Sequence, residues 1–75
     1  MQFRYTKHVK KRIFQRGLTA EKVENTVANP DRTRSSFGGR YLAQKAFHGK
    51  ILEVIYIKKG KNISLITAYW LKERN

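Results

Sequence analysis

Three basic side chains recur at four-residue spacing near the start of the chain, and one of them titrates near neutral pH. His8, Arg12 and Arg16 lie in the run T-K-H-V-K-K-R-I-F-Q-R-G. Each residue of a helix advances by about 100°, so residues four apart share one side of it. An imidazole can take or give a proton, and a guanidinium can bind two phosphate oxygens at once. The spacing therefore predicts a phosphate-binding stripe along a helix.

The stripe holds the groups that metal-free cleavage of RNA needs. In that reaction the 2′-hydroxyl attacks the adjacent phosphorus, which requires a base, an acid for the leaving 5′-oxygen, and cations for the added phosphate charge. We expect His8 to act as base or acid, while Arg12 and Arg16 hold the phosphate. The alternative is structural: His8 would bond to the sheet, and Arg12 would pair with a glutamate. The candidates for that pairing are Glu21, Glu24 and Glu53.

A second histidine, His48, precedes Gly49 and could share the acid and base roles, although a solvated turn residue is the simpler interpretation. Neither histidine has a metal-ligating partner at a suitable spacing, and no carboxylate cluster accompanies them. The pair Gly38-Gly39 lacks the Lys-Ser or Lys-Thr that a phosphate-binding loop carries. The sequence therefore predicts a site without metal or cofactor.

The chain is short and strongly basic. Its 75 residues include 17 lysines and arginines but only 5 acidic residues, for a formal net charge of +12. This length predicts one domain, residues 1–75, with a thin core. The charge raises self-repulsion, and it favours nucleic acid as partner over an anionic membrane or an acidic protein. Further contacts with nucleic acid are expected from Lys7, Lys11, Arg40, Lys58, Lys59 and Lys61.

The composition also bears on location. The chain has no cysteine, which is typical of a reducing cytoplasm. The N-terminus lacks an apolar signal core, and the longest apolar stretch, 51–57, is broken by Glu53 and is too short to span a bilayer. We therefore expect a soluble cytoplasmic protein.

Capping residues delimit two helices. Thr6 is a good N-cap for a helix over 7–16, and Gly17-Leu18 is suited to end it with a left-handed glycine and an apolar contact. Thr19 would cap a second helix, which must stop at Asn29-Pro30 because the residue before proline avoids helical geometry. Each helix has an apolar face, made by Val9, Ile13, Val23 and Val27.

After Pro30 the pattern changes to period two, and Gly38-Gly39 is a hairpin-type turn signal. Consecutive strands joined by short turns pair antiparallel. The expected fold is α+β, with both helices on one face of a three- to four-stranded antiparallel meander. The expected segments are strands over 40–48, 51–58 and 63–70, a short edge strand at Phe3 and Tyr5, and a polar tail over 71–75.

The last two predicted strands are apolar on both faces, whereas two helices can cover only one. Strict alternation would place Thr67 and Tyr69 with Ile63 and Leu65, opposite Ala68 and its neighbours. The uncovered face would then bind a partner or stack nucleobases. The alternative is that the termini or a curled sheet cover it.

The run T-K-H-V-K-K-R-I-F-Q-R-G-L-T-A-E-K-V, the later N-P, and the segments I-L-E-V-I-Y and I-S-L-I-T-A-Y resemble domain-of-unknown-function family 4258 over about residues 5–70. Such domains are similar to the RelE-like and BrnT-like toxin fold of metal-independent ribonucleases. The resemblance implies an RNA-cleaving toxin, ribosome-dependent or free, that an acidic antitoxin neutralises. The site residues it implies are His8, Arg12, Arg16 and Thr67, with Tyr69 as same-face neighbour.

Two other functions stay open from the sequence. A non-enzymatic RNA- or ribosome-binding module would show salt-sensitive binding without cleavage. A helix-turn-helix DNA-binding protein would use the short glycine-containing connection between the helices, but its second helix carries Glu21 and Glu24, which disfavour contact with phosphates. An oligomer is compatible with each of these functions.

Overall fold

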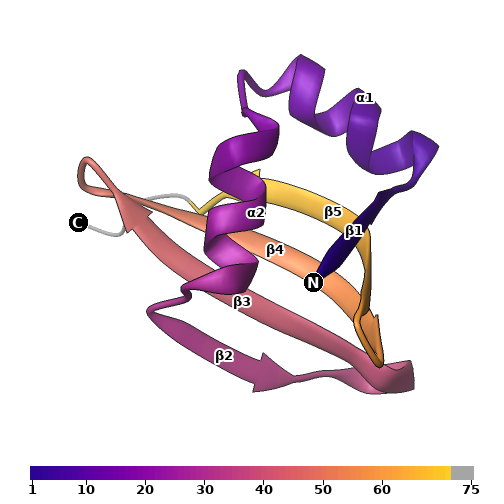
Figure 1. Cartoon of the computed structure of the whole chain (residues 1–75). Coiled ribbons are helices and arrows are strands. Elements are labelled where there is room, and N and C mark those ends of the chain that lie inside the picture. The colour runs from indigo at the N-terminus through magenta and orange to yellow at the C-terminus, as the bar shows by residue number, and fades with distance from the viewer. Residues whose placement is uncertain (72–75) are drawn as a thin grey trace.

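The computed structural model describes residues 1–71, in which two helices pack on a five-stranded mixed sheet of strand order β1-β5-β4-β3-β2 (Figure 1). The α+β class is as predicted, and the polar tail expected over 71–75 lies mostly outside the described residues. Neither helix in the described part is long and apolar enough to cross a membrane. The elements are β1 (Gln2–Tyr5), α1 (Lys7–Gln15), α2 (Ala20–Ala28), β2 (Arg32–Ser35), a 3₁₀ turn (Phe37–Gly39), β3 (Arg40–Phe47), β4 (Lys50–Lys59) and β5 (Asn62–Trp70).

The expectation of three to four antiparallel strands is wrong in one respect. Strands β2 to β5 form an antiparallel meander, but β1 is a fifth strand that pairs parallel to β5, from Gln2 beside Asn62 to Tyr5 beside Leu65. Period two predicts a strand but not its direction. The chain returns to β1 only after both helices and three strands, so no short turn dictates that pairing.

Helix α1 begins and ends where its capping residues predict. The Thr6 hydroxyl accepts a hydrogen bond from the Val9 amide at 3.2 Å and donates one to the Leu65 carbonyl at 3.0 Å, which ties the helix start to β5. At the other end Gly17 has φ of 62°, and the Leu18 amide donates to the Ile13 carbonyl at 2.9 Å. This is the bond expected of a left-handed glycine stop, and it ends α1 at this point.

Because Thr6 makes both bonds, Thr6→Ala is expected to lower the free energy of unfolding by about 1–2 kcal/mol in urea denaturation. Thr19 is the matched control, since its hydroxyl caps α2 by accepting from the Lys22 amide at 3.1 Å but makes no hydrogen bond to the sheet. A larger loss in Thr19→Ala than in Thr6→Ala would contradict this account of the joint between α1 and β5.

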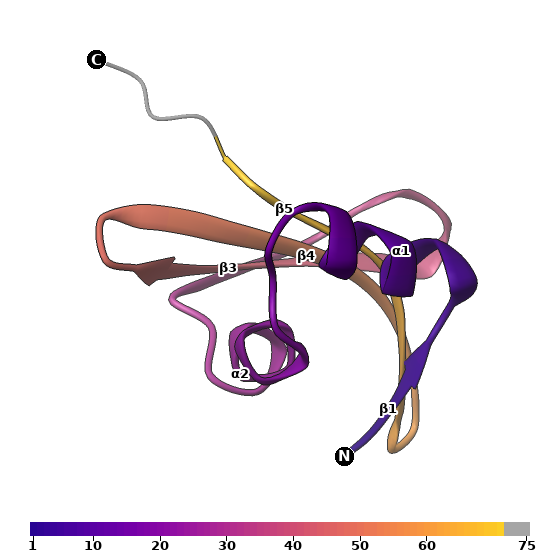
Figure 2. The ribbon, with the colours of Figure 1, turned by 90° about the horizontal axis from the view of Figure 1, so that it is seen from above.

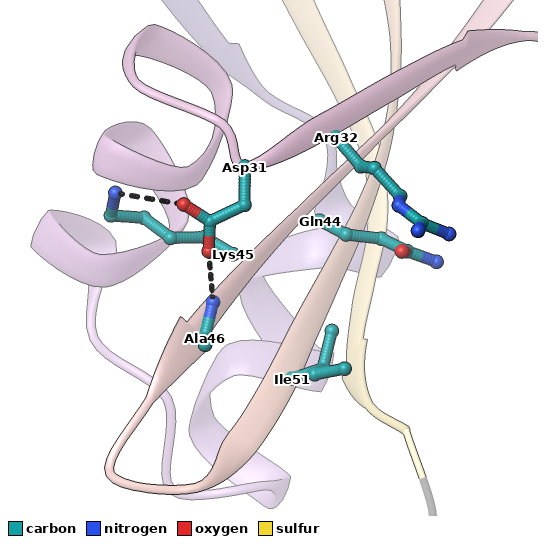
Figure 3. Close-up of a pocket in the computed structure, with 6 residues that line it drawn as sticks. All are labelled: Asp31, Arg32, Gln44, Lys45, Ala46 and Ile51. Carbon is teal, nitrogen blue, oxygen red and sulfur yellow. Dashed lines mark hydrogen bonds and ion pairs between the residues drawn. The ribbon is translucent and has the colours of Figure 1, made fainter.

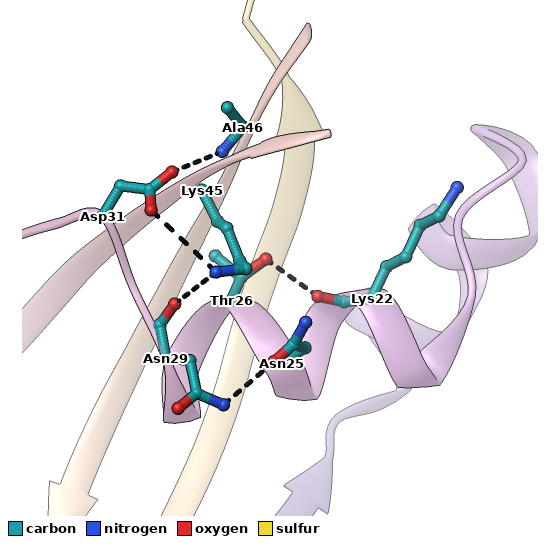
Figure 4. A network of polar contacts seen from close by, with 7 residues as sticks. All are labelled: Lys22, Asn25, Thr26, Asn29, Asp31, Lys45 and Ala46. Atoms are coloured by element: carbon teal, nitrogen blue, oxygen red, sulfur yellow. Dashed lines mark hydrogen bonds and ion pairs between the residues drawn. The ribbon is translucent and has the colours of Figure 1, made fainter. Parts of the chain in front are cut away.

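Polar contacts fasten the end of α2 to β3 (Figure 4). The Lys45 ammonium donates to the Asn29 carbonyl at 2.8 Å, where a cation complements the carbonyl end of a helix. It also lies 3.9 Å from the Asp31 carboxylate, whose other oxygen accepts from the Ala46 amide at 2.8 Å. Lys45 and Asp31 are therefore used in holding the fold.

Helix α2 lies on one face of the sheet, and α1 lies along the side where β5 and β1 run (Figures 1 and 2). The prediction that both helices bury their valines is confirmed, with Val9 and Val23 fully buried. No helix among the described residues lies on the other face, which we call the helix-free face. The buried core consists of Val9, Leu18, Val23, Val27, Ala43, Leu52, Val54, Tyr56, Ile63, Leu65 and Ala68.

A β-bulge corrects the predicted faces of the last strand. Ile55 pairs with Thr67 and Tyr56 with Leu65, so Ile66 is an extra residue in β5. One extra residue exchanges the two faces of a strand beyond it. Ala68 consequently joins Leu65 in the core, and Thr67 and Tyr69 move to the helix-free face.

Candidate functional site

His8 and Arg12 form a contact on the solvent side of α1. The Arg12 Nε–H points at the His8 Nε2 at 3.5 Å, and an Arg12 Nη1–H points at the Gln15 amide oxygen, also at 3.5 Å. His8 is exposed, so a substrate can reach its ring. In this geometry the Nε2 lone pair faces Arg12, so a substrate must displace that contact before His8 can accept a proton there.

Arg16 caps α1 and reaches β5. Its Nη1 donates to the Ala68 carbonyl at 3.0 Å, and its Cζ lies 5.8 Å from the centroid of the Tyr69 ring. A guanidinium over an aromatic face is attracted by the ring electrons. Arg16 thereby joins the cationic stripe of α1 to the edge of the helix-free face.

Tyr69 is in turn held by a buried carboxylate. Its hydroxyl donates to one Glu53 oxygen, and the Gln44 amide donates to the other at 2.7 Å. Glu53 is only 6 % exposed although no helix covers its face. Burial, and then the hydrogen bond to Glu53, raise the pKa of Tyr69 to about 12, while Arg16 opposes the shift. Tyr69 is thus a neutral, fixed hydroxyl at neutral pH.

The raised pKa predicts an alkaline loss of stability. The unfolded tyrosine ionises from its ordinary value of 10.0, while the folded hydroxyl keeps its proton to about 12. The unfolded state therefore binds fewer protons between these values, and the free energy of unfolding falls as the pH rises through that range. Thermal unfolding of Tyr69→Phe should show a smaller fall than the wild type, and an identical fall would contradict this assignment. Part of the fall remains in the variant because the pKa of Tyr5 is also raised, by burial and by its bond to Glu24.

The predicted catalytic residues lie in two groups one helical turn apart, about 6 Å along α1. The structure brings His8 together with Arg12, and Arg16 together with Tyr69. Thr67 precedes Ala68, whose carbonyl Arg16 binds, but within residues 1–71 no side-chain hydrogen bond joins Thr67 to the others. Their roles in catalysis stay predictions.

The second histidine lies elsewhere. His48 is exposed in the turn between β3 and β4, with φ of 51°. That turn and α1 are at opposite sides of the molecule in both Figures 1 and 2. A shared acid and base role with His8 therefore has no geometric support.

Arg12 does not form the alternative ion pair with a glutamate in the described part of the chain. The Glu24 carboxylate accepts from the Tyr5 hydroxyl, and Glu53 accepts from Tyr69 and Gln44. Among residues 1–71 the ion pair within 4.0 Å is that of Lys45 with Asp31, at 3.9 Å. The cations of α1 consequently have no carboxylate partner within 4.0 Å in the described part of the chain.

The residues predicted to contact nucleic acid are all exposed but occupy different surfaces. Lys7 and Lys11 lie on α1. Arg40 opens β3 beside Ile57, and the three lysines of the predicted set, Lys58, Lys59 and Lys61, surround the turn between β4 and β5. They do not form one patch.

Sequence reasoning missed several polar groups of the helix-free face. Gln44 and the carboxylate of Glu53 were not assigned to the site, and Arg32 and Arg34 were not singled out. The alternation in Arg32–Ser35 was the available signal, because period two places both arginines on one face. Figure 3 shows the Arg32 and Gln44 side chains extending side by side, away from Asp31 and Lys45. Within residues 1–71, no three side chains of the types His, Cys, Asp or Glu gather closely enough to hold a metal ion.

The family of the chain follows from a comparison with known families. Residues 5–70 match the family described as Domain of unknown function (DUF4258), so the protein belongs to that family. None of the curated proteins and none of the solved structures that were compared matches the chain.

Proposed function

We propose that this protein binds RNA through α1 and cleaves it with the groups of the stripe, without a metal ion. The observation that carries the proposal is the unneutralised charge of α1. The helix has no acidic residue in its first turn, begins with Lys7 and His8, and makes no ion pair within the described residues. Cations are unfavourable at the positive end of a helix dipole. Like charges four residues apart cost about 0.2–0.5 kcal/mol each. Binding of a polyanion would neutralise these charges and relieve both unfavourable interactions.

The proposed chemistry assigns a role to each group. His8 takes the proton of the 2′-hydroxyl or protonates the leaving 5′-oxygen, and the adjacent Arg12 stabilises the phosphate as charge builds up. Arg16 keeps free N–H groups beyond its bond to Ala68, and it holds the phosphate at the edge of the sheet. Tyr69 acts as a positioning group rather than a base, because its raised pKa keeps the hydroxyl protonated, and its proton is directed at Glu53. Thr67, on the same face, would orient the substrate.

The biological setting belongs to the same proposal. From the similarity expected between domains of this family and RelE-like and BrnT-like toxins, we infer a toxin in a toxin–antitoxin system, acting on free or ribosome-bound RNA in the cytoplasm. An acidic antitoxin would be its protein partner, since a chain of charge +12 attracts polyanions of either kind.

Inducible expression in cells tests this setting. Growth arrest accompanied by loss of RNA is expected, and His8→Ala or Arg12→Ala should relieve it. Lys50→Ala is the matched control, because Lys50 is an exposed cation at the turn between β3 and β4, away from α1. Arrest that His8→Ala and Arg12→Ala leave intact would contradict the proposed site.

A non-enzymatic RNA-binding module is the second candidate, and Arg16 favours it. One of its N–H groups is already committed to the Ala68 carbonyl, which suits a structural cation. This candidate predicts RNA binding that weakens roughly tenfold or more from low to physiological salt, with no cleavage. The helix-turn-helix alternative is weaker, since α2 buries Val23, Thr26 and Val27 against the sheet and carries Glu21 in its first turn.

A further inference from the structure

The register of the strands gathers cations on the helix-free face. Side chains of adjacent strands that are paired in register point to the same side of a sheet. On β2, Arg32 pairs with Gln44 of β3, and Arg34 pairs with Leu42. On β4, Glu53 pairs with Gln44, and Ile57 pairs with Arg40. All of these lie opposite the core residues of β4. The cations on this face are Arg4, Arg32, Arg34, Arg40 and Lys59.

The face is positive and has little to neutralise it. Glu53 is the carboxylate that the described strands place there, and it is 6 % exposed and bonded to Tyr69 and Gln44. Between the cations lie the partly exposed apolar side chains Leu42 and Ile55. Charge complementarity therefore calls for an anionic partner that also has apolar surface.

One end of this face has a depression whose side chains are suited to bind a nucleotide. It is lined by Arg34, Ser35, Ser36, Phe37 and Leu42. The Phe37 ring is 94 % exposed in the turn between β2 and β3. An exposed ring can stack a base, the guanidinium can bind a phosphate, and the hydroxyls can donate to or accept from a base edge. No packing role accounts for so exposed a phenylalanine.

The depression is connected to the proposed catalytic groups across the sheet. Thr67, Ile55, Leu42 and Arg34 form one cross-strand row from β5 to β2, and its β2 end lies in the depression. Three strand spacings of about 4.8 Å make this row about 14 Å long. Arg16 donates to the carbonyl of Ala68, the residue after Thr67, and so lies at the β5 end of this row. A few extended nucleotides span that distance.

We propose that the helix-free face is a track for single-stranded RNA, running from Arg16 and Tyr69 to a nucleotide subsite at Arg34 and Phe37. The inference rests on the proposed function, and it says where on the protein the RNA substrate of that function binds. An acidic protein would also satisfy the arginines, but the serine hydroxyls beside the exposed ring suit the edge of a stacked base, and duplex RNA hides its bases from such a ring.

The test is binding of a short single-stranded RNA whose 2′-hydroxyls are methylated, so that it cannot be cleaved. Phe37→Ala is expected to weaken binding roughly 5- to 100-fold, and Phe37→Trp to preserve it. With an abasic oligonucleotide of the same length, Phe37→Ala should have no effect. Arg34→Ala should weaken binding and lower the salt dependence by about 0.7 of a log unit per log unit of salt. Lys50→Ala, which removes the same charge outside the track, should do neither.

The outcomes separate this inference from the proposed function. RNA binding that depends on Arg12 but not on Arg34 or Phe37 would overturn the track and leave the proposed function standing. Absence of RNA binding by the wild type would overturn both. Two results together would identify an acidic protein as the partner and overturn the track. Polyglutamate would bind in a way that depends on Arg34 and would displace the RNA. Phe37→Ala would weaken binding of the abasic oligonucleotide as much as binding of the intact one.

Discussion

The His8→Ala variant is expected to bind RNA as tightly as the wild type and to cleave it about 10²–10⁴ times more slowly. His8 is exposed, so its removal leaves no cavity, and the fold should be unchanged. The loss would fall on the chemical step because the imidazole moves a proton there. Arg12→Ala is expected to lower the rate by about 10²–10³ and also to weaken binding, since it removes a fixed cation. Single-turnover cleavage of a labelled RNA, with binding measured in parallel, checks both.

His48→Asn is the matched control for this experiment. It removes the other histidine, and asparagine tolerates the left-handed backbone that His48 adopts at φ of 51°. Its cleavage rate should equal that of the wild type. A wild-type rate in His8→Ala, or an equal loss in His48→Asn, would contradict the assignment of His8.

Glu53→Ala is expected to lower the free energy of unfolding by about 2–4 kcal/mol, which is most of the stability of a domain this small. The buried carboxylate accepts from both Tyr69 and Gln44, and its removal leaves a cavity and two partly buried donors without an acceptor. Glu53→Gln should cost much less, because its amide oxygen still accepts a hydrogen bond and the volume is kept.

Urea denaturation of these variants measures the effect, and a double-mutant cycle with Tyr69→Phe measures the coupling between the two side chains. Equal stability of Glu53→Ala and Glu53→Gln would mean that the hydrogen bonds of Glu53 contribute nothing. Independent effects of Glu53→Ala and Tyr69→Phe would mean that the carboxylate does not hold the ring beneath Arg16.

The local signals in the sequence predicted local structure well. The threonine caps and Gly17 located both helices to within a residue or two, because capping bonds are satisfied by neighbours in the chain. The strands over 40–48, 51–58 and 63–70 were also found, since β-branched residues and turn glycines mark them. The prediction that one face of the sheet lacks a helix follows from these elements and is confirmed for the described residues.

Long-range pairing could not be predicted in the same way. The parallel pairing of β1 with β5 joins residues some sixty positions apart, from Gln2 with Asn62 to Tyr5 with Leu65, and no local pattern encodes it. The extra residue Ile66 is equally hidden, because an apolar residue fits either face, yet it moves Tyr69 to the helix-free face. The contacts of Tyr69 with Glu53 depend on that shift.

The sequence predicted only the part of the candidate site that lies on a single helix. Four-residue spacing placed His8, Arg12 and Arg16 on neighbouring turns, and the contact between His8 and Arg12 follows from it. The bond of Arg16 to Ala68 and the burial of Glu53 required the sheet to be known. Spacing predicts which side chains share a helix face but not which strand they meet.

The end groups of cleaved RNA test the central claim most directly. Attack by the 2′-hydroxyl, with His8 moving the proton, must leave a 2′,3′-cyclic phosphate on one fragment and a 5′-hydroxyl on the other. We expect the wild-type protein to produce these ends from single-stranded RNA in the presence of a chelator, and to leave the 2′-deoxy analogue intact. Fragments with 5′-phosphate and 3′-hydroxyl ends, or no fragments from purified protein, would contradict the account.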